Sequence, residues 1–175
     1  MKTAVLVLLS FLVVAAPVTS QPSDDKLIVP GGRIGKWTLL MAIDDLVRMN
    51  GPAQTLSEPD RDFARKITEF HWQQPGLFLT AITFEDRSLV VLRLNEAPLA
   101  RYEYKTDRGI GFQSARPEIL KAYGQPTITK RNGTLDMLDM IYDKIGIDFG
   151  IDYDNRTISS IAIFQPGRAK GIWKF

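Results

Sequence analysis

Two short stretches of the chain carry hydrophobic residues at the spacing of an amphipathic helix, and both end at a glycine closely followed by a proline. In the second stretch, residues 109–126, Pro117 suits the first helical turn. Three apolar residues form one stripe there: Ile119, Leu120 and Tyr123. The first stretch, residues 41–52, repeats this arrangement. The pattern predicts helices over residues 42–50 and 117–123.

The residues at the ends of the second helix indicate where it begins and stops. The Ser114 hydroxyl can accept a hydrogen bond from the first turn, and Glu118 lies near the positive end of the helix dipole. Gly124 ends the helix, with Pro126 just beyond it. We therefore expect Ser114 to be the N-terminal cap.

After each predicted helix the hydrophobic period changes to two, which is typical of β-strands. Turn residues separate the runs, among them Pro75-Gly76 and Asp154-Asn155. Six strands are predicted, three after each helix: residues 68–73, 77–84, 89–94, 138–142, 147–153 and 158–164.

The order of one helix and three strands occurs twice, so the sequence predicts a tandem repeat. Gly51 and Gly124 are 73 positions apart, whereas Phe84 and Tyr153 are 69 positions apart, which indicates one short insertion or deletion. The predicted fold class is α+β, with two tandem units that can join into one continuous sheet. Each unit is a helix packed on a three-stranded antiparallel sheet. The predicted boundaries are a signal peptide at 1–20, a first unit with its N-terminal lead-in at 21–96, a linker at 97–108, and a second unit with a C-terminal tail at 109–175.

These repeated helix ends and hairpin turns carry a resemblance to a known superfamily. Two copies of a helix ending in a glycine and a proline, followed by strands with the pattern GI.F and a turn of the type D(N/G)R, resemble the units of small bacterial envelope proteins. The superfamily is that of the beta-lactamase-inhibitor-protein-like and outer-membrane-assembly lipoprotein (SmpA/OmlA-like) folds. The resemblance covers residues 27–166 and implies an extracytoplasmic protein–protein interaction module. This chain lacks the lipidated cysteine of the assembly lipoproteins and carries two units where they carry one.

The N-terminus has the sequence pattern of a cleavable export signal. Lys2 precedes an apolar run of about 13 residues, which is short of the roughly 20 residues needed to span a bilayer. Small residues at Val18 and Ser20 predict cleavage before Gln21 and a periplasmic or secreted location. Removing 20 of the 175 residues leaves 155, enough for one domain or two small ones. Retention of the segment as a membrane anchor is the alternative.

Composition excludes several classes of function. The sequence contains no cysteine, so disulfides, thiol nucleophiles and thiolate metal sites are ruled out. Without Lys2 the chain carries 21 basic and 20 acidic side chains, a net charge of +1. Because no basic run is interleaved with aromatic residues, we expect no nucleic-acid partner.

Residues that could support chemistry are sparse. His71 is the only histidine, and a predicted strand places it between Phe70 and Trp72. A structural role is typical of such a position, and the alternative is a hydrolase that pairs His71 with a carboxylate.

The aspartates of the last two strands do not match a calcium loop, because Arg156 occupies a ligand position. A period of two instead places Asp148 and Asp152 on a solvated sheet face. The sequence therefore predicts no catalytic residue, no cofactor and no metal site.

One sheet face is the candidate partner-binding surface. An offset of 69 residues aligns Phe78 and Ile82 with Ile147 and Ile151, and assigns them to the helix-covered face. The opposite face of the second copy is polar, whereas that of the first copy is apolar. The candidate residues are Leu77, Leu79, Ala81, Leu89 and Val91. Cover can come from the linker, from the second unit or from another protein.

The function predicted from the sequence is an exported, non-enzymatic binding module of the bacterial envelope. Its partner is an unknown protein or a second copy of the chain, with membrane contact only if the signal segment is retained. The alternatives are the His71 hydrolase and a membrane-anchored structural protein of the envelope.

Overall fold

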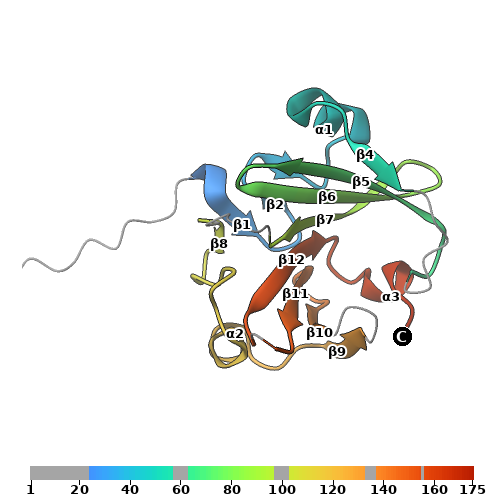
Figure 1. Cartoon of the computed structure of the whole chain (residues 1–175). Helices are drawn as coiled ribbons and strands as arrows, with labels where there is room; N and C mark the ends of the chain where they lie inside the picture. Colours follow the sequence, from blue (N-terminus) through green and yellow to red (C-terminus); the bar gives the residue numbers. More distant parts are fainter. Residues whose placement is uncertain (1–23, 57–62, 97–102, 133–136, 155) are drawn as a thin grey trace, which may run out of the picture.

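The structure is a computed structural model that describes residues 24–56, 63–96, 103–132, 137–154 and 156–175. An eight-stranded antiparallel sheet dominates it, with the strand order β4-β5-β6-β7-β12-β11-β10-β9 (Figure 1). The strands are β4 (Gln54–Leu56), β5 (Ile67–Gln74), β6 (Leu77–Phe84), β7 (Leu89–Asn95), β9 (Ile128–Asn132), β10 (Met137–Tyr142), β11 (Ile147–Asp152) and β12 (Ile158–Phe164).

Helix α1 (Ile43–Asn50) precedes the first four of these strands, and helix α2 (Arg116–Tyr123) precedes the last four. The two sets meet where β7 pairs with β12, so the sheet is continuous. The fold class is therefore α+β, and each half contributes four strands where three were expected. The extra strands, β4 and β9, are the two edges of the sheet.

A second, small sheet has the order β3-β2-β1-β8. It is built from very short strands: β1 (Leu27–Val29), β2 (Arg33–Ile34), β3 (Trp37–Thr38) and β8 (Lys105–Thr106). The first three follow a short 3-10 helix, η1 (Asp24–Lys26). The N-terminal lead-in therefore reverses direction at residues 30–32, where the Gly31 N–H donates to the Gly146 carbonyl at 3.0 Å.

The described residues form two hydrophobic cores. The main core joins both halves of the large sheet, both helices and the small sheet. Its fully buried members include Ile28, Ile34, Ile43, Leu46, Leu79, Leu92, Leu94, Ile119 and Phe149. The second core is covered by helix α3 (Ala169–Ile172) and contains Phe63, Ile67, Ile82, Phe84, Val91, Ile141, Ala162, Phe164 and Trp173.

The N-terminal cap of α2 differs from the prediction. Ala115, not Ser114, is the capping residue, and the carboxylate of Glu118 accepts a hydrogen bond from the Ala115 N–H at 2.7 Å. The Ser114 hydroxyl instead accepts from the Gly111 N–H at 3.3 Å. The Glu118 side chain therefore reaches back to the start of the helix and satisfies the N–H of the capping residue, which is the glutamate half of a capping box.

The assignment of sheet faces is also corrected. Leu79 and Ala81 lie in the main core with Phe149 and Ile151, whereas Ile82 lies in the second core. All four main-core residues have odd numbers, so the two halves align with an even offset. The predicted offset of 69 residues is odd, and a shift of one residue exchanges the two faces of a strand. The prediction therefore assigned the buried and exposed faces of the first half the wrong way round.

No helix in the described part of the chain is long and apolar enough to span a membrane.

Candidate functional site

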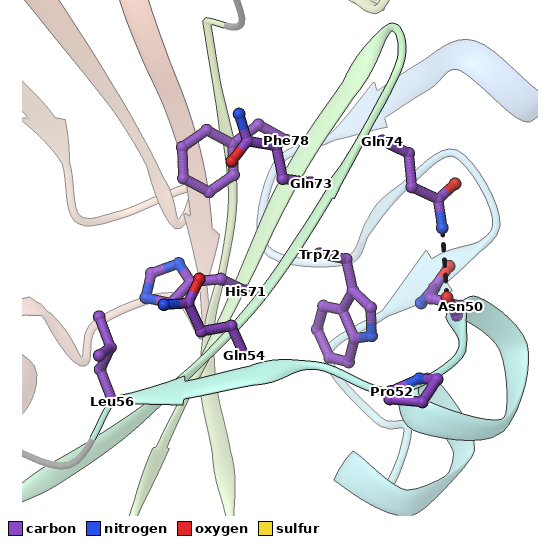
Figure 2. Close-up of a pocket in the computed structure, with 9 residues that line it drawn as sticks. All are labelled: Asn50, Pro52, Gln54, Leu56, His71, Trp72, Gln73, Gln74 and Phe78. Atoms are coloured by element: carbon purple, nitrogen blue, oxygen red, sulfur yellow. Dashed lines mark hydrogen bonds between the residues drawn. The ribbon is translucent and has the colours of Figure 1, made fainter.

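A hollow of about 340 Å³ lies at the open edge of the sheet, where β4 begins and β5 ends. Figure 2 shows Gln54, His71 and Phe78 on one side of β5, and Trp72 and Asn50 on the other. The complete lining is Asn50, Pro52, Gln54, Leu56, His71, Trp72, Gln73, Gln74 and Phe78. Its volume falls at the lower end of the range typical of ligand pockets.

The geometry of the β5–β6 hairpin determines which backbone groups face this hollow. Gln74 pairs with Leu77 across a two-residue turn, so these two residues exchange both hydrogen bonds of a ladder step. Because hydrogen-bonded pairs alternate along an antiparallel ladder, the N–H and C=O of Gln73 and His71 point away from β6, toward the outer edge. His71 pairs there with Gln54 on β4.

The β4–β5 ladder ends at the pair of Gln54 and His71. The next pair outward would join Gln73 to Pro52, and proline has no N–H to donate. Two side-chain hydrogen bonds also fix residues 50–51 away from the edge of β5 at this point. The Trp72 indole N–H donates to the Gly51 carbonyl at 2.8 Å. The side-chain amide of Gln74 donates to the Asn50 carbonyl at 3.2 Å (Figure 2). The backbone N–H and C=O of Gln73 therefore lie beyond the end of the ladder, at the hollow.

His71, which lines the hollow, is in contact with polar side chains that lie outside the lining. His71 Nδ1 lies 3.1 Å from the Thr80 hydroxyl, which also accepts a hydrogen bond from the Asn95 amide at 2.9 Å. His71 Nε2 lies 3.1 Å from Oε2 of Glu69, although the two are not aligned as a hydrogen bond.

The remaining lining is uncharged. The Phe78 ring lies 5.9 Å from the His71 ring at an angle of 57°. Carboxamides of Gln54, Gln73 and Gln74 supply donors and acceptors, and the lining contains no lysine, arginine, aspartate or glutamate. A site of this composition suits an uncharged ligand that forms hydrogen bonds.

The residues predicted as a partner-binding face are placed inside the molecule. Leu79 and Ala81 are fully buried in the main core, and Leu77 and Leu89 are half-buried against it. Val91 is fully buried in the second core, on the opposite face. The set therefore does not form one surface, because α1, the second half of the sheet and α3 cover it from within the chain.

The interpretation of Asp148 as part of a solvated face is wrong. Asp148 is only 4% exposed, because its cross-strand neighbours Ile141 and Ala162 belong to the second core. Burial, with a smaller contribution from the Asp139 charge, raises the pKa of the Asp148 carboxyl well above its usual value. Among the described residues, no group of three or more potential ligands could hold a metal ion.

The sequence identified one residue of the hollow, His71, and the structure brings a carboxylate, Glu69, to it. The sequence analysis did not identify Gln54 or Gln73. The available signal was the combination of Pro52, which cannot donate to a ladder, and the Pro75-Gly76 turn, which fixes the hydrogen-bonding phase of β5.

Comparisons with known proteins define only the class of fold. No family profile and no curated protein sequence matches this chain. Among solved structures, a DUF4309 family protein (YjgB) from Bacillus subtilis is similar, with a TM-score of 0.55 and 15% identity, over 77% of this chain and 88% of that one. The chain therefore shares its α+β architecture with that protein.

Two further structures are more distant. A cysteine-rich secretory protein from Staphylococcus aureus has a TM-score of 0.47 at 10% identity, over 78% of this chain and 48% of that one. An extracellular protein containing a SCP domain from Bacillus anthracis has a TM-score of 0.44 at 10% identity, over 89% of this chain and 51% of that one. None of the three confirms the beta-lactamase-inhibitor-protein-like superfamily.

Proposed function

We propose that this protein is an exported, non-enzymatic module of the bacterial envelope that binds another protein at the open edge of β5. The observation that carries the proposal is the hollow at the end of the β4–β5 ladder, where the Gln73 backbone lies beside uncharged side chains. An open sheet edge is a common place for proteins to associate.

We also interpret the two halves as copies of one unit, each a helix followed by four antiparallel strands. The order of elements supports this: α1 leads into β4–β7, and α2 leads into β9–β12. Both helices contribute to the main core, Leu46 from the first and Ile119 from the second. In this interpretation the two edges, β4 and β9, are equivalent positions, and each begins two residues after a proline, Pro52 and Pro126.

The non-enzymatic part of the proposal rests on Thr80, the hydroxyl nearest to His71. Thr80 is 2% exposed, and the Asn95 side-chain amide already donates to its hydroxyl oxygen. A nucleophile must be reachable by substrate, so this hydroxyl is better explained as support for the His71 ring.

A hydrolase is the second candidate, because the contact between His71 Nε2 and Glu69 pairs a histidine with a carboxylate. A hydrolytic activity on ester or amide substrates that His71→Ala abolishes would favour this candidate over the binding module. Equal rates for the variant and the wild-type protein would reject it.

Export is tested by the mass of the protein recovered from the exported fraction of cells. We expect a chain that begins at Gln21, since the preceding residues have the pattern of a cleaved signal. A cytoplasmic, full-length product would reject export, and a full-length product in the membrane would support the anchored alternative.

The binding site is tested by photo-crosslinking in intact cells. A photoreactive amino acid at Gln73, which is exposed at the hollow, should give a discrete crosslinked protein adduct. The same residue at Lys144, exposed in the turn between β10 and β11, is the control and should give none. An adduct at Lys144 but not at Gln73 would move the binding surface elsewhere and reject the proposed site.

A further inference from the structure

We propose that the hollow binds an extended, uncharged peptide segment, which pairs its backbone with Gln73 and so continues β4 along the edge of β5. This inference rests on the proposed function and names the class of ligand. A glycan with amide and hydroxyl groups is the competing ligand that the experiment must separate.

The backbone of β5 supplies the first argument. The N–H and C=O of Gln73 point to the outer edge, and Pro52 lacks the N–H that would complete the next ladder step. One peptide residue in extended conformation can both donate to and accept from Gln73. A glycan lacks this alternating donor and acceptor at the spacing of a strand, so the open ladder position favours a peptide.

The side chains on the β6-facing wall supply the second argument. In an antiparallel pair, residues directly opposite each other project to the same face of the sheet. The peptide residue opposite Gln73 would therefore project its side chain directly beside that of Gln73, on the face of the sheet that also carries Phe78 and His71 (Figure 2). The Phe78 and His71 rings form an aromatic wall on that face, and the Gln54 carboxamide lies beside it.

The charges around the hollow supply the third argument. Apart from His71, the lining has no acidic or basic side chain to neutralise a charged ligand, and burying an unpaired charge is costly. Glu69, although outside the lining, lies against His71 on this face and disfavours an anionic side chain or a free C-terminus. The peptide is therefore uncharged and internal to a longer chain.

The experiment uses the mature protein labelled with ¹⁵N and three probes of equal length. These are a pool of acetylated, amidated pentapeptides built from uncharged residues, the same pool with N-methylated backbones, and a chitin pentasaccharide. We expect the first pool to shift the Gln73 amide resonance and slow its hydrogen exchange. The N-methylated pool should bind at least about tenfold more weakly, because it has lost the backbone donors.

Two substitutions at the same position separate the backbone from the side chain. Both variants lose the Gln73 carboxamide, but Gln73→Ala keeps the backbone N–H, so Gln73→Pro should bind the peptide pool at least about tenfold more weakly than Gln73→Ala. A proline is tolerated at an open edge, and if Gln73→Pro does not fold, the N-methylated pool decides the same question.

Equal binding of methylated and unmethylated peptides would overturn the inference, as would stronger binding of the pentasaccharide or no shift at Gln73. These outcomes are distinguishable from failure of the proposed function. A protein adduct at Gln73 in cells without peptide binding would keep the protein-binding module and reject the extended-peptide mode.

Discussion

Replacing Leu79 by aspartate is expected to unfold most of the protein at neutral pH. Leu79 is 0% exposed and lies between its cross-strand partners Trp72 and Leu94 in the main core. Truncating a buried leucine to alanine typically costs about 2–5 kcal/mol, and an unpaired buried carboxylate adds to that cost. Since small domains are stable by only about 5–15 kcal/mol, this loss approaches the total. Urea unfolding followed by circular dichroism measures it.

Leu77→Asp is the matched control, because Leu77 is on the same strand and the same face but lies half-buried beside the hairpin turn. We expect it to lower the free energy of unfolding by a much smaller amount. The pair also tests the original interpretation of this face as a binding surface. A folded Leu79→Asp protein that had lost only its association with a partner would show that the face is exposed in solution.

Local rules were sufficient to predict helices α1 and α2 and the six central strands of the large sheet. Strands β6 and β12 begin and end where the period of two predicted, and α1 and α2 are within one residue of their expected bounds. The signals were short-range: alternation along a strand, a Pro75-Gly76 turn, and a glycine after each helix. The edge strand β9 was missed because its sequence, ITKRN, is polar, and a solvent-exposed edge does not require an apolar pattern.

Assembly of these elements required information that a single sequence does not carry. The parity of the repeat offset decided which face of β6 is buried. Phe84 and Tyr153 are 69 positions apart, whereas the turn glycines Gly76 and Gly146 are 70 apart, and only the burial pattern of the fold selects the even offset. The burial of Asp148 depended on α3, a short C-terminal helix that packs on the second core from outside the repeat.

The candidate site was even less accessible to sequence reasoning. His71 attracted attention because of its chemistry, but the hollow is defined by where the β4–β5 ladder stops. That point depends on the register of Gln54 against His71, and register is a tertiary property. Gln73 has an ordinary side chain, and its proposed role belongs to its backbone.

A buried carboxyl group on the second core provides the last prediction. Asp148 and Arg93 lie on the same face of the sheet, separated by the small side chain of Ala162 on β12. Within the described chain, Asp148 Oδ1 and Arg93 Nε have no hydrogen-bond partner. Burial and then the Asp139 charge raise the pKa of Asp148, and these effects outweigh the opposing charges of Arg93 and Lys130.

Asp148→Asn is therefore expected to stabilise the protein at neutral pH, because the neutral amide removes the cost of burying a charged carboxylate. The sign follows from linkage. Below the usual pKa of 3.8 the carboxyl is protonated in both states, and the variant gains nothing. As the pH rises through the raised pKa of the folded state, the unfolded chain ionises first and wild-type stability falls. The variant, which cannot ionise, does not share this loss.

Urea unfolding of both proteins between pH 3 and pH 8 measures the difference. Asp45→Asn is the control, because it makes the same chemical change at a side chain that is 44% exposed and paired only with Arg48 on the surface of α1. Its effect should stay within about 0.5 kcal/mol and should not grow with pH in this way. If Asp148→Asn instead destabilises the protein at pH 8 and is neutral at pH 3, the Asp148 carboxylate is charged and stabilised by Arg93. The buried acid would then be one half of an ion pair across Ala162, with a pKa below its usual value.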